Sequence, residues 1–150
     1  VDQDSNEAIR LFKKAAMNSI SNEGYGHAAT TLGWIYFTGE YPNVDRDLIK
    51  AHRWNLLGSK LKHTNASANL ALIYAGGFGV DPNINKTIDY FIESIEYYYP
   101  ITGLDNETDD WKKYLPNPDP KFQEARDLYL QAINTGKKEF VDKLKQLKNK

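Results

Sequence analysis

The side chains best suited to acid–base or metal chemistry in this chain are its three histidines, His27, His52 and His63. A helical metal site places two histidines four residues apart, so that both rings reach one ion. No two of these three have that spacing. The chain has no cysteine, which excludes a disulfide, a thiolate ligand and a cysteine nucleophile together. The sequence therefore predicts no catalytic residue, no metal site and no cofactor.

Composition and charge narrow the classes of partner. The 150 residues are enough for one domain, and they carry a net charge of −1. Residues 137–150 hold six lysines against two acidic residues, so a mildly acidic body precedes a lysine-rich end. A nucleic-acid groove needs basic residues along its contact surface, and a membrane span needs about 20 apolar residues in a row. The sequence has neither feature, which argues against nucleic-acid binding and membrane insertion.

An internal repeat is the main signal in the sequence. One stretch begins at Ala28 and a second at Ala66, and an apolar stripe recurs in both with the spacing of a helix. A small residue inside the stripe indicates that a neighbouring helix approaches closely, and a glycine just after it suits a left-handed helix end. The matched pairs, all 38 residues apart, are Ala28/Ala66, Leu32/Leu70, Gly33/Ala71, Tyr36/Tyr74 and Gly39/Gly77.

Each stretch is followed by a second matching half. Residues 44–51 with Trp54 correspond to residues 80–87 with Tyr90, 36 positions later. The same half recurs from Val1 and again around Ala125. Asp4, Asp47 and Asn83 precede the apolar run of their copies and are predicted to cap helices. The repeat also accounts for the glycines of residues 76–79, which no strand precedes, so they are not expected to form a phosphate loop.

These patterns predict an all-α fold, a right-handed superhelix (solenoid) of antiparallel helix pairs in a single domain. Helices are expected at 6–18, 26–38, 47–60, 65–76, 84–98 and 121–134, with a capping helix at 137–150. The parts are a second half-repeat at 1–19, full repeats at 24–60 and 64–98, and a half-repeat at 118–136. Residues 99–117 break the pattern and are predicted to form a loop and a short helix. Either this repeat has degenerated or an insertion has replaced its first helix.

The combined motif resembles that of the Sel1-like (Sel-one-like) repeat family, which is related to the tetratricopeptide repeat. The family pattern A-x-x-x-L-G-x-x-Y, then G-x-G-V, then D-x-x-K-A is nearly intact, and Gly77-Phe78-Gly79-Val80 matches the loop letter for letter. Ala71, Asn83 and Thr87 depart from it mildly. The resemblance implies a scaffold or adaptor rather than an enzyme, with another protein or a peptide bound on the concave face lined by the first helix of each repeat.

By that resemblance the concave face carries a set of eight candidate partner-binding residues: His27, Thr30, Thr31, Trp34, Phe37, Asn65, Asn69 and Leu72. Trp34 either packs on the next repeat or is exposed as an interface anchor. The alternatives are a hydrolase using carboxylates and histidines on this face, and a helical-repeat RNA binder. No carboxylate cluster supports the first, and the acidic body argues against the second.

The first helix raises a separate expectation. Val1 matches Val44, so the chain is predicted to start at the second half of a repeat and to belong to a longer array. Apolar residues cover much of the circumference of this helix. We expect them to be exposed or to be buried by self-association with a second copy. They are Ala8, Ile9, Leu11, Phe12, Ala15 and Ala16.

Overall fold

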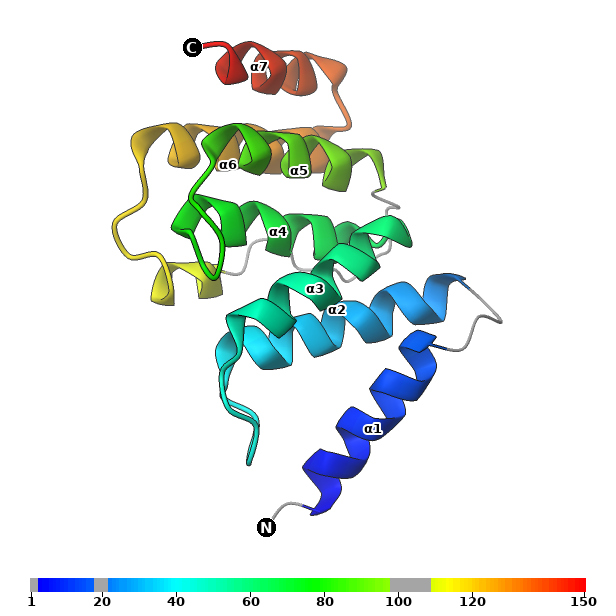
Figure 1. The fold of residues 1–150 in the computed structure, drawn as a ribbon. Coiled ribbons are helices and arrows are strands. Elements are labelled where there is room, and N and C mark those ends of the chain that lie inside the picture. The colour runs from blue at the N-terminus through cyan, green and yellow to red at the C-terminus, as the bar shows by residue number, and fades with distance from the viewer. Residues whose placement is uncertain (1–2, 18–21, 98–108) are drawn as a thin grey trace. The chain divides into compact units, whose positions relative to one another are not determined.

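A computed structural model describes residues 3–17, 22–97 and 109–150, and within these ranges the chain is helical with no strand (Figure 1). The predicted all-α fold class is confirmed. The described chain packs as two compact units, residues 1–70 and 71–150, which divide within one helix. The assignment of a single domain stays a prediction, and the two units are described in turn.

The first unit contains α1 (Gln3–Met17), α2 (Asn22–Thr38), α3 (Leu48–Lys60) and the start of α4 (Thr64–Gly76). α1 packs along α2, and α2 and α3 form an antiparallel pair (Figure 1). α1 begins before Asp4, so the prediction that Asp4 caps this helix is wrong. Glu7 pairs instead with Arg10 one turn later, at 2.6 Å between carboxylate and guanidinium.

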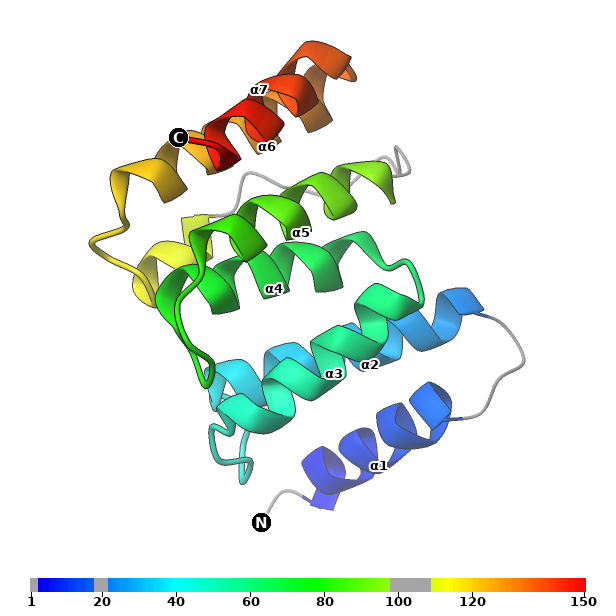
Figure 2. The same ribbon diagram turned by 45° about the horizontal axis from the view of Figure 1, so that its top comes forward.

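The second unit contains the end of α4, then α5 (Ile84–Glu96), the 3₁₀ helix η1 (Asp109–Lys113), α6 (Pro120–Thr135) and α7 (Lys138–Lys148). α5, α6 and α7 pack on one another (Figure 2). The predicted helix over residues 84–98 ends at Glu96, and residue 98 lies outside the described residues.

The second helix of each full repeat begins at its predicted cap. Asp47 and Asn83 have extended backbones, and the Oδ1 atom of each accepts the N–H three residues on at 3.0 Å. Their own N–H groups donate to the carbonyl oxygens of Tyr36 and Tyr74, at 2.8 Å and 2.9 Å. The tyrosine of each first helix therefore fixes, through its backbone, where the second helix starts.

Glycine is required where the chain turns sharply between paired helices. Gly39 and Gly77 have φ values of +62° and +66°, as predicted for left-handed helix ends. Gly33 is small for a different reason. A Cβ atom there would lie 2.7 Å from Cγ of Asn55, so α2 and α3 approach as closely as the repeat pattern implied.

The apolar stripe of the repeat forms the core. Leu32 and Leu70 are fully buried, and Tyr36 and Tyr74 are nearly so, which confirms the alignment of the two first helices. Tyr74 stacks on Tyr90 with ring centroids 5.6 Å apart. The matched positions of the repeat therefore hold the same packing roles in space.

Residues 109–117 provide a buried aromatic side chain to the second unit. The predicted short helix is the 3₁₀ helix η1, and residues 98–108 lie outside the described part of the chain. Trp111 is buried edge-on against Phe122, with ring centroids 5.2 Å apart, and the guanidinium of Arg126 lies 4.8 Å from the Trp111 ring. This segment therefore packs on α6.

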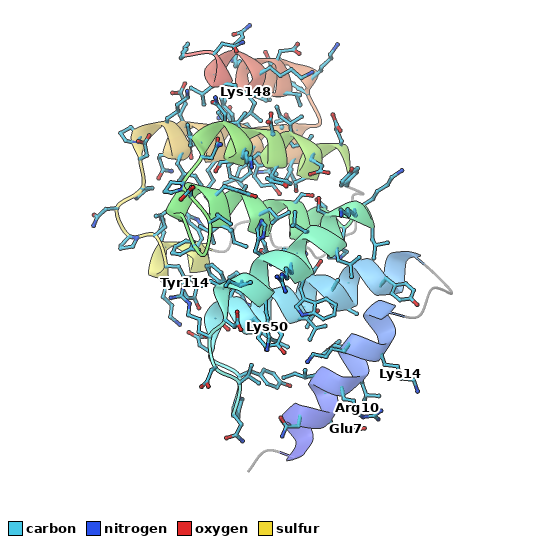
Figure 3. All side chains as sticks on the ribbon, viewed as in Figure 1. Glu7, Arg10, Lys14, Lys50, Tyr114 and Lys148 are labelled. Carbon is cyan, nitrogen blue, oxygen red and sulfur yellow. The ribbon has the colours of Figure 1, made fainter. Side chains whose placement is uncertain are left out.

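The C-terminal helix is amphipathic, as predicted. Leu144 and Leu147 are buried, while most of the lysines are exposed. Lys148, labelled in Figure 3, is the half-buried exception. Its ammonium group lies 2.7 Å from the Asp89 carboxylate on α5. Leu144, Leu147 and the ion pair between Lys148 and Asp89 therefore contribute to the packing of α7 in the second unit.

Candidate partner-binding surface

Three of the predicted residues form a stripe along α2. His27, Thr31 and Trp34 are four and three residues apart, which places them on one side of a helix. His27 is exposed, and Thr31 and Trp34 are half-buried. We call these three residues the α2 face.

Three other predicted residues are not at the surface, so they are not part of this face. Thr30, Phe37 and Leu72 are 7%, 2% and 7% exposed. Thr30 lies on the side of α2 that meets α3, because a Cβ atom on Gly58 would come within 2.7 Å of its Oγ1 atom. The family pattern identifies the core positions of each helix, but it does not predict whether the residues next to those positions are buried.

Trp34 is held by its neighbours. Its ring stacks on Phe37, with centroids 5.5 Å apart and planes tilted by 21°. Phe37 is fixed in turn by Arg46, whose guanidinium lies 5.4 Å from the Phe37 ring and whose Nε donates to the Phe37 carbonyl oxygen at 2.7 Å. Of the two positions considered for Trp34, the structure gives an intermediate one: one face packs within its own unit and part of the ring is accessible.

His63 adjoins the α2 face, although it was not among the eight candidate partner-binding residues. Its ring meets that of His27 edge-on, with centroids 5.6 Å apart. Its Nδ1 lies 2.8 Å from Oγ1 of Thr30, which donates its hydrogen to the Gly26 carbonyl at 2.6 Å. Since Thr30 has one hydrogen to give, Nδ1 is the donor of the pair and Nε2 is the basic nitrogen.

The end of α3 explains how His63 reaches this place. Lys62 has a φ of +61°, its N–H donates to Ser59, and the N–H of His63 donates to Gly58. This is the Schellman ending of a helix, with lysine where glycine is usual. A lysine gives no sequence signal for such a turn, so the position of His63 was not predictable. Burial lowers the pKa of His63, and the neighbouring His27 lowers it further.

Two predicted residues lie at the start of α4. Asn65 and Asn69 are both half-buried. The side-chain N–H₂ of Asn69 donates to Oδ1 of Asn55 at 3.1 Å, so this amide joins α4 to α3. It therefore serves the fold of the first unit.

Comparison with protein families identifies the repeat. The family model for the Sel1 repeat matches residues 1–19, 26–63 and 64–96, which is more than half of the chain. The chain belongs to the Sel1 repeat family. Sel1 repeats are generally modules for protein–protein interaction. No curated protein and no solved structure matches the chain.

The Sel1 matches follow the helices closely. The repeat at 26–63 covers α3 and most of α2, the repeat at 64–96 covers α4 and α5, and the match at 1–19 falls on α1. The boundary between the two full repeats falls before α4, whereas the compact units divide inside it. The first turns of α4 therefore belong to the second Sel1 repeat in sequence and to the first unit in packing.

Metal sites and membrane-spanning helices are two further features of interest in this Sel1 chain. Residues 3–17, 22–97 and 109–150 contain no group of three or more histidine, aspartate or glutamate side chains placed to hold a metal ion. None of the helices described is long and apolar enough to cross a membrane.

Proposed function

We propose that the chain binds another protein or a peptide on the α2 face, as a scaffold or adaptor without catalytic activity. The observation that carries this proposal is the placement of Trp34. It is an aromatic side chain that is partly accessible and already fixed by the Phe37 stack, in a family of interaction repeats. Tryptophan is among the residues that most often dominate binding energy at interfaces.

The fixed Trp34 ring suits an anchor because little rotamer freedom is left to lose. Ordering a mobile side chain on binding costs about 0.5–1.5 kcal/mol, and a stacked ring has largely met that cost in the free protein. Thr31 and His27 then provide polar atoms beside the ring, although the Thr31 hydroxyl donates to the His27 carbonyl at 2.9 Å. An aromatic surrounded by polar groups matches the centre and rim of a small interface.

The charge of α2 indicates the kind of partner. Glu23 is the sole charged residue in the sequence of this helix. A partner therefore gains little from charge, and we propose an extended or helical segment that presents an apolar side chain to Trp34 and hydrogen-bonding groups to Thr31 and His27. Its affinity should depend weakly on salt, because screening acts on charge pairs.

Selection of a binding peptide from a random display library tests this proposal. The peptide is selected on the intact chain, and its Kd is measured for the wild type, Trp34→Ala and Ile49→Ala. Ile49 is 60% exposed on α3 and serves as the matched apolar control. Loss of a hot-spot tryptophan should weaken binding by about 30-fold or more, while the control stays within about threefold. Equal affinity for the wild type and Trp34→Ala would refute the α2 face as the binding surface.

A further inference from the structure

Two histidine rings from different elements lie side by side in the first unit. His27 belongs to α2, and His63 lies in the turn between α3 and α4. Their ring centroids are 5.6 Å apart, and the ring planes are inclined by 65°. Two imidazoles that ligate one zinc ion at about 2.0–2.1 Å have ring centres roughly 5–6 Å apart. The separation of the two rings therefore suits a shared metal ion.

His63 is held in place through its backbone. Its N–H donates to the Gly58 carbonyl oxygen at 3.0 Å, and its own carbonyl oxygen accepts from the N–H of Ala66 at 3.1 Å. Gly26 on α2 allows the side chain to approach, because a Cβ atom there would lie 3.0 Å from Cβ of His63. One ligand of the pair is therefore positioned before any ion binds, as a precise site requires.

The Thr30 hydroxyl determines which nitrogen of His63 is available to an ion. Thr30 donates its hydrogen to the Gly26 carbonyl oxygen, so Oγ1 accepts the Nδ1–H of His63 and leaves the lone pair on Nε2. Histidines that bind metals almost always donate their other ring N–H to an oxygen in this way, which fixes the tautomer and the ring orientation. Thr30 is 7% exposed, so water competes little for this hydrogen bond.

His27 is the adaptable ligand of the pair. It is exposed, and an exposed ring turns about its side-chain bonds within nanoseconds, so a nitrogen of His27 can be aimed at an ion bound to Nε2 of His63. No third histidine, aspartate or glutamate joins the pair within the residues that the structure describes. The remaining coordination positions are therefore open to water or to a group from a bound partner.

We propose that His27 and His63 together bind a divalent transition-metal ion that favours imidazole ligands, such as Zn²⁺ or Cu²⁺, with Thr30 as a positioning residue. Imidazole nitrogen suits zinc, copper and nickel, whereas magnesium and calcium prefer oxygen ligands. The spacing rule for a metal site on one helix does not detect this pair, because its members are 36 residues apart and meet through the left-handed turn at Lys62. The inference is independent of the proposed function, since zinc binding and peptide binding are measured separately.

A titration of the full chain with zinc alone, followed by nuclear magnetic resonance of the imidazole nitrogens at neutral pH, tests the proposal. Nε2 of His63 and one ring nitrogen of His27 should shift together and saturate at one ion per chain. His52 is the matched control, because it is the remaining histidine of the chain and is half-buried on α3. Its ring nitrogens should not move.

Substitutions distinguish a metal site from a packing contact between the rings. His27→Gln and His63→Gln should each weaken zinc binding by about tenfold or more, while His52→Gln binds as the wild type does. Thr30→Val should also weaken it by about tenfold or more, the usual effect of losing a partner of a metal ligand. In this variant both tautomers of His63 should be populated, which the nitrogen shifts report and a merely structural role of Thr30 would not change. Zinc binding that survives both histidine substitutions, or no saturable shift of the two rings, would overturn the proposal and leave a packing contact only.

Discussion

Asn55 and Asn69 join two helices of the first unit through their side-chain amides, with Oδ1 of Asn55 accepting from Nδ2 of Asn69 at 3.1 Å. Asn55 is fully buried, and its own Nδ2 donates to the Ala51 carbonyl oxygen at 2.8 Å. Gly33 leaves the room that this amide occupies. A buried polar group is tolerated here because its hydrogen bonds are satisfied by neighbouring atoms.

Asn69→Ala should lower the free energy of unfolding by about 1–3 kcal/mol, because it leaves Oδ1 of Asn55 buried without this donor. Asn65→Ala is the matched control, with the same change near the start of the same helix. Urea unfolding of the two variants measures the difference. Equal stability of both variants would show that the amide pair contributes nothing to the first unit.

Gly77 and Gly136 allow the cost of a left-handed backbone to be distinguished from the cost of steric overlap, because only Gly77 has close neighbours. Gly77 and Gly136 both have a φ of +66°, but a Cβ atom at Gly77 would lie 2.6 Å from Cγ of Pro82, while nothing lies within 4 Å at Gly136. Gly136→Ala should cost about 1–2 kcal/mol, the penalty for a left-handed L-residue. Gly77→Ala should cost about 1–3 kcal/mol more, because the rigid proline ring adds overpacking. Thermal unfolding of both variants checks this order, and a Gly136→Ala cost equal to or above that of Gly77→Ala would contradict it.

Most of the fold was predictable because the same core positions recur in two aligned repeats. The spacing of Leu32 and Leu70, and of Tyr36 and Tyr74, predicted buried positions that the structure confirms. The sequence pattern did not predict burial where it depends on residues that are distant in sequence. Thr30 is polar and adjoins an apparent surface residue, yet it is buried against α3.

The candidate site was predictable only in part, for reasons of the same kind. The helical spacing of His27, Thr31 and Trp34 is a local property, so the sequence identifies it. The contact between His27 and His63 depends on the left-handed backbone of Lys62. Glycine is the usual sequence signal for such a backbone, and this position has lysine instead. The Asp4 cap was wrong because α1 begins before that residue.

Leu70→Ala should destabilise the chain by about 2–5 kcal/mol, because it removes a fully buried side chain from the repeat core and leaves a cavity. Leu11→Ala provides the matched control, since Leu11 is 51% exposed and its loss should change stability by about 0.5 kcal/mol or less. Denaturant midpoints of the two variants measure both effects. An unchanged midpoint for Leu70→Ala would contradict the alignment of the two Sel1 repeats.

His63 makes the stability of the chain depend on pH in a stated direction. Burial, together with His27, lowers its pKa in the folded chain below the ordinary value of 6.5, so the unfolded chain binds its proton first as the pH falls. The contribution of His63 is therefore complete above pH 6.5 and is lost as the pH falls through the pKa of the folded state. Unfolding measured from pH 8 to pH 5 should show a smaller loss for His63→Gln than for the wild type. A wild-type chain that gains stability over this range through His63 would contradict the assignment.

The central claim is that the α2 face is where a partner binds, and nuclear magnetic resonance titration of the chain with the selected peptide tests it most directly. The account predicts that the indole N–H of Trp34 and the backbone amides of His27 and Thr31 shift together and saturate with one Kd, while the amide of Ile49 on α3 does not move. Shifts centred on Ile49 or on α7, with the Trp34 indole unchanged at saturation, would contradict it.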